Sequence, residues 1–475
     1  MGSRTWLDLR RASLGIGLLL LASGCASPQG TSRKLETALD RYVAAPDTNY
    51  SWRVASSERV ADVTVTVIDL TSQSWLTPAE VNQTLWRHWL VVARPDHVEH
   101  ATGLLFIGGG NNKDSRLPKP PEQLLHVAKA TKSVVAELRM VPNQPLVFMN
   151  DGRERVEDDL IAYTWDRFLR TGDERWPARL PMTKAAVRAM DTMTAFCAGA
   201  EGGGVPVTTF VVAGGSKRGW TTWTTAIVDR RVVAICPIVI DLLNLVPSFE
   251  HHYRVYGFFA PAVQDYVDAG IMDWMGTPEF GTLLDLVEPY QYRDRLTMPK
   301  LMLNACGDQF FLPDSSQFYF KDLKGPKYLR YVPNTDHSMK KSDSWETLLA
   351  WYHMQLHKTP LPRFTWRAQG PNTLRVETVD RPVAVRLWQA TNPSARDFRL
   401  DTLGPAWTSE ALADQGGGVY IGRVEPPAQG WKAYGVELTY DVGAPAPFKV
   451  TTEIRVTPDA LPYGPYQPKP RTISR

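Results

Sequence analysis

Short apolar runs, separated by amphipathic segments, recur along most of the chain. Runs rich in Val, Ile and Leu that each end in a turn signal lie at residues 102–110, 208–215, 232–241 and 299–308. Segments with helical periodicity separate them, the clearest at residues 183–198. Strands that are apolar on both sides are typical of a parallel sheet covered by helices. The pattern therefore predicts an α/β domain with a mostly parallel sheet and helices on both faces.

Other parts of the chain depart from this pattern. Residues 60–72 alternate apolar and polar side chains, which predicts an edge strand. Two long stretches, about 142–183 and about 242–296, are rich in aromatic and charged residues and are expected to be helical cap insertions. Residues 363–460 alternate with period two and carry frequent turn residues, which predicts a C-terminal antiparallel β-sandwich of the immunoglobulin or fibronectin type.

The two ends of the chain are not expected to belong to the folded domains. Arginines precede a short apolar run that ends in Leu21-Ala22-Ser23-Gly24-Cys25, which is similar to a lipoprotein signal peptide over residues 1–25 with lipidation at Cys25. An ordinary signal peptide is the alternative and predicts a periplasmic or secreted protein. With the lipid anchor, the expected location is the bacterial envelope, and Ala26 after the cysteine favours the outer membrane. Residues 26–33 are expected to form a linker, residues 34–362 the α/β domain, and residues 461–475 a disordered tail.

Composition narrows the classes of partner. The formal net charge is +3 over 475 residues and no basic run concentrates it, so nucleic acid is not an expected partner. Cys197, Cys236 and Cys306 match neither a zinc pattern nor a redox pair. No metal site and no cofactor are predicted. The sequence leaves open whether a disulfide forms and what the oligomeric state is.

Ser216 is the candidate nucleophile. It follows the apolar strand and two glycines, and a segment with helical character begins directly after it. Strand, tight turn, serine and helix is the context of a nucleophile elbow. The strict G-x-S-x-G pattern requires glycine at position 218, where Arg218 stands, and Gly219 comes one residue later. We therefore expect either that the helix lies farther from the preceding strand, or that Gly219 provides the space that glycine at 218 would give.

A serine needs a histidine base, and the histidine needs a carboxylate to orient it. Asp308 follows one strand in the form G-D-x-x-x-x-P, and His337 follows the next strand. The order Ser, Asp, His along the chain is that of the α/β-hydrolases. Asp241 also ends a strand and is the alternative acid. The oxyanion hole is expected from the backbone N–H of Lys217 together with N–H groups of Gly109, Gly110 and Asn111.

The motifs "PNQPL", "VEDDLIAYTWDRFL", "GGSKRGWTTW", "CGDQFFLPDSS" and "YVPNTDHSM" together resemble the PhoPQ-activated pathogenicity-related proteins. This resemblance spans nearly the whole mature chain. It implies an exported α/β-hydrolase-like protein of the serine peptidase and esterase lineages, with Ser216, Asp308 and His337 as the triad. It also implies that Asn143 and Gln144 contact substrate, and that Arg218 is the family's own form of the elbow.

The leading interpretation is an exported serine hydrolase that cleaves an ester or an amide bond through an acyl-enzyme on Ser216. Arg218 and Trp220 are further candidates for substrate contact. The Lys217 and Arg218 side chains favour a carboxylate-bearing substrate unless they are solvated or paired with the acidic "EDD" run. The alternative is a binding or signalling protein built on a hydrolase scaffold, because a fold does not by itself establish an activity.

Overall fold

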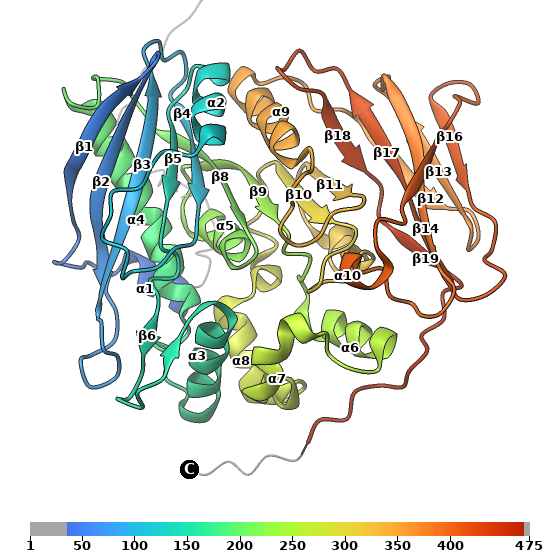
Figure 1. Ribbon diagram of the computed structural model, residues 1–475, viewed down its shortest axis with the longest axis horizontal. Helices are drawn as coiled ribbons and strands as arrows, with labels where there is room; N and C mark the ends of the chain where they lie inside the picture. Colours follow the sequence, from blue (N-terminus) through green and yellow to red (C-terminus); the bar gives the residue numbers. More distant parts are fainter. Residues whose placement is uncertain (1–35, 470–475) are drawn as a thin grey trace, which may run out of the picture. The chain divides into compact units, whose positions relative to one another are not determined.

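The apolar runs form the strands of a large sheet at the centre of the fold (Figure 1). The structure is a computed structural model, and it describes residues 36–469. The predicted signal peptide, Cys25 and the linker lie outside the described residues. The strands of the central part are β1 (Ser51–Val60), β2 (Val63–Ser74), β3 (Leu85–Pro95), β4 (Thr102–Ile107), β5 (Val135–Leu138), β8 (Thr209–Gly215), β9 (Val232–Ile238), β10 (Lys300–Ala305) and β11 (Lys327–Val332).

The order of these strands is β1-β2-β3-β5-β4-β8-β9-β10-β11. Strands β5, β4, β8, β9, β10 and β11 pair in parallel, whereas β1, β2, β3 and β5 pair antiparallel. A sheet of this order with helices on both faces is an α/β-hydrolase fold, as the sequence predicts. Because the six parallel strands point the same way, their carboxyl ends meet at one edge of the sheet, where α/β enzymes place their sites.

The segment predicted as an edge strand is not at the edge. It forms β2, and β1 pairs with it on the outer side. Most of β1 is exposed or half-buried, so its sequence lacks the apolar alternation that would have marked it as a strand. β2 carries buried side chains on both faces because helices and strands cover both of its sides.

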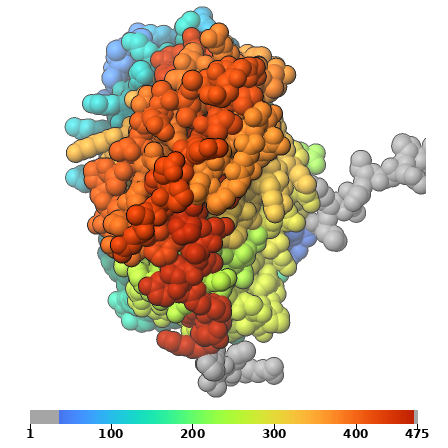
Figure 2. Space-filling view, turned by 90° about the vertical axis from the view of Figure 1, so that its right-hand side faces the viewer, coloured from blue at the N-terminus to red at the C-terminus, as the bar shows by residue number. Residues whose placement is uncertain are grey.

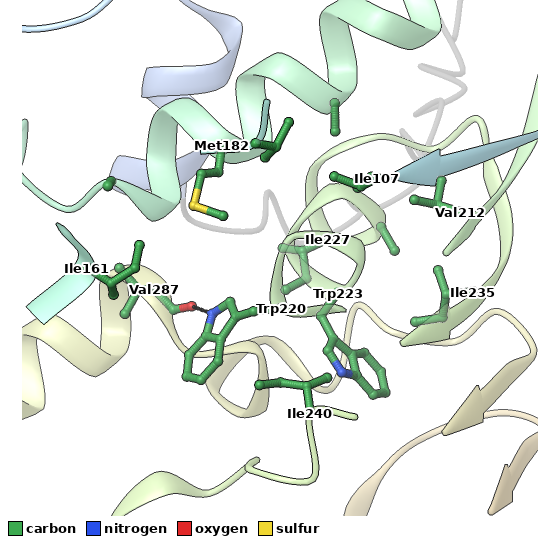
Figure 3. Packing of buried hydrophobic residues seen from close by; sticks show 14 of the residues in the cluster. Ile107, Ile161, Met182, Val212, Trp220, Trp223, Ile227, Ile235, Ile240 and Val287 are labelled. Carbon is green, nitrogen blue, oxygen red and sulfur yellow. Dashed lines mark hydrogen bonds between the residues drawn. The ribbon is translucent and has the colours of Figure 1, made fainter. Parts of the chain in front are cut away.

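Helices cover the two faces of the sheet. α2 (Glu122–Thr131) and α9 (Ser344–His357) pack together against one face. α4 (Arg179–Ala198) and α5 (Lys217–Val228) pack against the other, with α1 (Ala38–Ala44) beside them. Figure 3 shows the core between the sheet and the helices α4 and α5. In it, Trp220 and Trp223 of α5 lie among aliphatic side chains of the sheet and of neighbouring helices. This burial fixes α5, and therefore the turn that precedes it, against the sheet.

The two insertions form the cap region in the lower part of Figure 1. The first contains a hairpin of β6 (Leu146–Val147) and β7 (Glu154–Arg155), then α3 (Glu157–Thr171) and the start of α4. The second is helical, and α3 contacts its α7 and α8. Its elements are α6 (Leu245–Tyr256), η1 (Pro261–Val263), α7 (Gln264–Asp268), η2 (Ile271–Trp274), α8 (Pro278–Val287) and η3 (Pro289–Tyr292). Two further short 3₁₀ helices follow β10, η4 (Ser315–Phe318) and η5 (Phe320–Asp322).

The C-terminal region is antiparallel, as predicted, but one of its sheets continues the central sheet. β18 pairs with β11 through Leu329 and Thr451, and the order then runs β18-β17-β14-β15, with β19 beside β17. A three-stranded sheet packs on this extension, and Figure 2 shows the region from outside in orange and red. The strands are β12 (Phe364–Ala368), β13 (Thr373–Thr378), β14 (Ala384–Asn392), β15 (Thr408–Ala411), β16 (Val419–Arg423), β17 (Trp431–Tyr440), β18 (Phe448–Thr451) and β19 (Arg455–Thr457). The short helix α10 (Leu400–Leu403) lies between β14 and β15.

The described part of the C-terminal tail differs from the expected disorder. Tyr463 N donates to Arg254 O at 3.1 Å, and the Tyr466 hydroxyl donates to Asp273 at 2.6 Å. The Tyr466 ring also packs against Tyr253 of α6. Residues 461–469 are therefore held along the helical insertion through aromatic side chains, which the high proline content of the sequence obscures.

Candidate active site

Ser216 lies at the junction between β8 and α5, where the chain turns directly from strand into helix. Its backbone has φ 57° and ψ −123°, a conformation that L-residues rarely adopt and that costs on the order of 1–3 kcal/mol. The turn is held by a hydrogen bond from Ser216 N to Ile238 O of β9 at 2.8 Å. The serine is partly exposed. A strained, accessible serine at a strand-to-helix turn is the geometry of a nucleophile elbow.

Two glycines allow the helix to approach the strand. A Cβ on Gly214 would lie 2.8 Å from Arg218 O. A Cβ on Gly219 would lie 2.9 Å from Gly214 O and 3.0 Å from Ile238 O. These neighbours are backbone atoms, so rotation of a side chain could not relieve the contacts. Gly219 therefore provides the close approach that the strict pattern assigns to residue 218, which is one of the two outcomes that the sequence allows.

His337 and Asp308 form a pair at the carboxyl ends of β11 and β10. The Nδ1 atom of His337 lies 2.9 and 2.8 Å from the two carboxylate oxygens of Asp308. Phe310 N donates to Asp308 at 2.8 Å, and His337 N donates to the Gln309 side chain at 3.0 Å, so the loops carrying acid and base are joined. With Nδ1–H donated to the carboxylate, the neutral ring presents Nε2 as an acceptor.

The Nε2 atom of His337 is buried and has no hydrogen-bond partner among residues 36–469. The Phe310 ring lies 4.3 Å from the imidazole, centroid to centroid, and restricts its position. Ser216 lies at the same edge of the sheet, directly after β8, and β9 separates β8 from β10. Contacts between nucleophile and base are often looser in enzymes without bound substrate. The structure thus pairs Asp308 with His337 and leaves Nε2 of His337 without a hydrogen-bond partner among the described residues.

Asp241, the alternative acid, does not contact His337. Its carboxyl group is buried and accepts hydrogen bonds from the hydroxyls of Tyr319 and Tyr331, the latter at 2.6 Å. Burial raises the pKa of Asp241 to about 7 despite the two tyrosine donors. Asp336, next to the histidine, turns away and accepts from Ser338 N and Oγ. Asp308 is the carboxylate that holds the imidazole.

Four backbone N–H groups are available for an oxyanion hole. Lys217 N begins α5, where the first N–H groups of a helix lack an internal partner. In the loop after β4, the N–H groups of Gly109, Gly110 and Asn111 have no acceptor within the described part of the chain. The same loop is fixed through its carbonyls, since Met140 N donates to Gly109 O at 2.9 Å. β4 and β8 are neighbouring strands, so this loop and the elbow lie side by side.

Asn143 and Gln144 are not free to contact substrate, contrary to the expectation from the resemblance. Asn143 is fully buried, donates to Arg87 O and accepts from Asn112 and Gln83. Gln144 donates to Glu157 at 2.6 Å and accepts from Glu157 N at 2.7 Å. Both amides use their hydrogen-bonding capacity to fix the loop beside the oxyanion-hole residues.

Arg218 also forms hydrogen bonds within the protein. Its guanidinium bonds both carboxylate oxygens of Glu157, at 2.8 and 2.6 Å, and donates to Val141 O at 2.5 Å. It also lies against Gly109, where a Cβ would come within 2.6 Å of Nη2. Burial alone would raise the pKa of Glu157, but Arg218 and Lys217 lower it to about 2. Arg218 therefore connects elbow, cap and oxyanion-hole loop, and its role as a substrate contact stays a prediction.

Lys217 and Trp220 point into the protein interior. Lys217 Nζ donates to Asp158 at 2.7 Å and is nearly buried. Trp220 is 1% exposed and donates from Nε1 to Val287 O at 2.7 Å, as Figure 3 shows. Trp220 is therefore a core residue and not a substrate contact. Lys217 and Arg218 are thus both paired with the acidic "EDD" run. This pairing is one of the alternatives that the sequence leaves open for the two cations.

A cleft of about 480 Å³ opens at the carboxyl ends of β4 and β5, beside the oxyanion-hole loop. Its charged side chains are largely paired, Arg116 with Asp114 at 3.0 Å and Arg139 with Glu137 at 2.8 Å. The lining residues are Trp89, Gly109, Gly110, Asn111, Asp114, Arg116, Leu117, Pro118, Lys119, Glu137, Arg139 and Met140. β4 is the neighbour of β8, and adjacent strands lie about 4.8 Å apart. The cleft therefore begins roughly one strand spacing away from Ser216.

Within residues 36–469, no three His, Cys, Asp or Glu side chains are grouped so that they could hold a metal ion. Cys197, Cys236 and Cys306 are buried free thiols, and burial raises the pKa of each. In that range, every helix is too short or too polar to cross a bilayer.

Known proteins are similar to this chain in sequence and in fold. The model of the PhoPQ-activated pathogenicity-related protein family matches residues 39–399. The "Autocrine proliferation repressor protein A" of Dictyostelium discoideum is 35% identical over 457 residues, covering 90% of this chain and 92% of that protein. Among solved structures, an acetyl xylan esterase from Paenibacillus sp. R4 is 14% identical, with a TM-score of 0.47 over 67% of this chain and 91% of that chain. Acetyl xylan esterase 1 from Thermoanaerobacterium sp. is 15% identical, with a TM-score of 0.46 over the same shares.

Proposed function

The chain belongs to the PhoPQ-activated pathogenicity-related protein family, and we propose that it is an exported serine hydrolase that cleaves an ester or an amide bond. The observation that carries the proposal is the strained backbone of Ser216 at the strand-to-helix turn. Such strain persists only where the surrounding structure enforces it, and it is typical of functional sites. The Asp308–His337 pair at the same edge of the sheet supports the same chemistry.

The proposed reaction follows from the roles of these groups. Ser216 Oγ attacks the substrate carbonyl while its proton passes to His337 Nε2, and Asp308 stabilises the resulting imidazolium. The oxyanion accepts hydrogen bonds from Lys217 N–H and from the loop of Gly109–Asn111. The imidazolium then protonates the leaving alcohol or amine, which leaves an acyl group on Ser216. Water, deprotonated by His337, releases the acid and restores the serine.

The charges of the site bear on the substrate class. Lys217 and Arg218 are paired with Asp158 and Glu157, so neither cation is available to a substrate carboxylate. The cleft beside the oxyanion-hole loop is lined by Trp89, Leu117 and Met140 and by charged side chains, of which Arg116 and Arg139 are paired. These observations favour an uncharged acyl or alcohol group next to the scissile bond.

A second candidate function is binding or signalling without turnover. The observation that favours it is the name of the curated relative, which is that of a repressor of proliferation and of no hydrolase. On this reading the hydrolase scaffold and its C-terminal β-region form a recognition surface.

Turnover distinguishes the two candidates. We expect wild-type protein to hydrolyse short p-nitrophenyl esters, aminoacyl p-nitroanilides or both, and Ser216→Ala to reduce the rate by several orders of magnitude. The ratio of the two activities identifies esterase or amidase chemistry. Folded wild-type protein that turns over neither substrate class would favour the binding function.

Export and anchoring belong to the same proposal. They rest on the apolar run and the Ala-Ser-Gly-Cys sequence that ends at Cys25, outside the described residues. Two or more acyl chains on Cys25 would hold the enzyme stably at a membrane, which one chain would not. In fractionated cells, wild-type protein should remain with the membranes and Cys25→Ser should not. A wild-type protein found only in the soluble fraction would contradict the anchor.

A further inference from the structure

One segment of the C-terminal β-region contacts both loops that carry the acid and the base. It comprises residues 396–407, between β14 and β15, and contains α10. We propose that this positioning segment orients Asp308 and His337, so that the C-terminal β-region is part of the catalytic unit. The inference rests on the proposed hydrolase function of the same site.

The first contact lies next to the acid. Leu400 N donates to Gly307 O at 3.0 Å, and Gly307 directly precedes Asp308. Gly307 N donates in turn to Thr335 O of the histidine loop at 3.0 Å. A Cβ at position 307 would lie 2.8 Å from both Thr335 O and Leu400 Cβ. The backbone before the acid is therefore enclosed between the histidine loop and the positioning segment.

The second contact lies at the far end of the acid loop. Arg396 Nη2 donates to Asp314 Oδ2 at 2.8 Å, and both side chains are almost fully buried. His251 of α6 lies 3.1 Å from the same carboxylate oxygen. Burial would raise the pKa of Asp314, but the charges of Arg396 and His251 hold it well below its usual range. A buried, hydrogen-bonded charge pair of this kind is costly to break on one side only.

The third contact holds the histidine loop. The Asn334 side chain donates to Trp407 O at 2.9 Å and accepts from Trp407 N at 2.9 Å. Asn334 precedes His337 by three residues and has φ 54°, which an asparagine tolerates better than most residues. The three contacts fix both ends of the acid loop and the start of the histidine loop from one continuous segment.

None of these groups touches the reacting atoms, so the expected effect is one of position. Displacements of about 1 Å in a catalytic group can cost roughly 100-fold in rate. We expect Arg396→Ala to lower kcat roughly 10- to 100-fold with KM within about threefold of wild type. Because a displaced Asp308 stabilises the imidazolium less, the acid limb of the kcat/KM profile should move to lower pH. A loss of stability alone would not move that limb.

The test compares Arg396→Ala with Arg396→Lys, Asn334→Gly and the control Arg375→Ala. Lysine keeps the charge and should restore part of kcat, and glycine at 334 keeps the positive φ while removing both bonds to Trp407. Arg375 pairs with Glu377 on the three-stranded sheet and with no other carboxylate of residues 36–469, so its removal should leave kcat unchanged. If Arg396→Ala fails to fold, Asn334→Gly decides.

Hydrogen exchange provides a readout that does not depend on activity. Amides of residues 306–314 and 333–339 should exchange faster in Arg396→Ala and Asn334→Gly than in wild type, with little change in the control. Folded variants with wild-type kcat, pH profile and exchange would overturn the inference. If wild-type protein shows no turnover while these loops exchange faster in the variants, the proposed hydrolase function fails but the positioning contacts stand.

Discussion

Two buried aspartates end neighbouring strands of this protein, and their surroundings give them different properties. Asp308 accepts hydrogen bonds from His337 Nδ1 and Phe310 N and serves as the partner of the base. Asp241 accepts hydrogen bonds from two tyrosine hydroxyls. A carboxylate in contact with a histidine can stabilise an imidazolium, whereas a carboxyl whose pKa is raised to about 7 is largely protonated below neutral pH.

Replacement of each aspartate separates these roles. Asp308→Asn should lower kcat on the order of 10⁴-fold, because the amide cannot stabilise the imidazolium and favours the wrong tautomer. Asp241→Asn replaces a carboxyl that is already largely neutral, so kcat should stay within a fewfold of wild type. Steady-state kinetics on one ester substrate measures both. Equal losses in the two variants would contradict the assignment of the acid.

The same residue predicts a pH dependence of stability. The pKa of Asp241 is about 7 in the folded protein, compared with an ordinary value of 3.8. The folded state therefore keeps a proton that the unfolded chain releases, and the free energy of unfolding contributed by this group falls as pH rises from about 4 to about 7. Asp241→Asn should remove that contribution. Urea denaturation of the wild type and of Asp241→Asn at pH 5 and pH 7 measures this contribution. The free energy of unfolding should fall more between the two pH values in the wild type than in the variant. An equal change in both proteins would contradict the prediction.

At the residue scale, the sequence indicates which polar residues follow strands better than it indicates which side chains bond to each other. Ser216, Asp308 and His337 stand out because each follows a strand in the order of the α/β-hydrolases. The structure joins Asp308 with His337 and puts Ser216 on a strained turn. The bonds of Arg218 and Gln144 to Glu157 are not apparent from the sequence, because Glu157 is distant from Arg218 along the chain and 13 residues from Gln144. Residue type alone cannot show that such a side chain is already satisfied.

At the element scale, the elbow depends on how closely α5 approaches β8. The helix starts at Lys217, and Gly219 of its first turn lies against backbone oxygens of β8 and β9. The buried face of α5, with Trp220 and Trp223, fixes the distance between helix and sheet. Any side chain at position 219 must therefore move the helix or the strand, and with it the serine.

A matched pair of glycine substitutions tests this geometry. Gly219→Ala should lower the free energy of unfolding by about 1–3 kcal/mol, because its Cβ would meet backbone atoms. Gly281 lies in the first half of α8, and a Cβ added there meets no neighbouring element within 4 Å. Gly281→Ala should therefore raise the free energy of unfolding by up to about 1 kcal/mol. Denaturant titration compares the two. Equal effects at both positions would show that the close approach does not matter.

Elements were predicted where their hydrophobic pattern was strong. The buried parallel strands and α4 follow from runs of Val, Ile and Leu and from helical periodicity. The sequence does not predict β1, because its side chains are exposed or half-buried and burial leaves little trace in its pattern. The segment that became β2 was then assigned to the edge of the sheet. A strand that is held by backbone hydrogen bonds alone, without burial of its side chains, has no hydrophobic pattern from which it could be predicted.

At the scale of the molecule, the described chain joins a hydrolase sheet to a β-region without a break in hydrogen bonding. β11 and β18 pair although Leu329 and Thr451 are far apart in sequence. Arg330 of β11 also forms a buried ion pair with Glu437 of β17 and a half-buried one with Asp343. The change of sequence pattern near residue 363 identified a new architecture, but such long-range pairing cannot be read from local periodicity.

The central claim is that Ser216 is an activated nucleophile, and covalent labelling tests it most directly. A fluorophosphonate probe reacts with a serine that is activated by a histidine and forms a stable adduct that mass spectrometry locates on a peptide. We predict one adduct per chain, on Ser216, that is absent in Ser216→Ala and forms far more slowly in His337→Ala. Folded wild-type protein that remains unlabelled, or an adduct that persists in Ser216→Ala, would contradict the account.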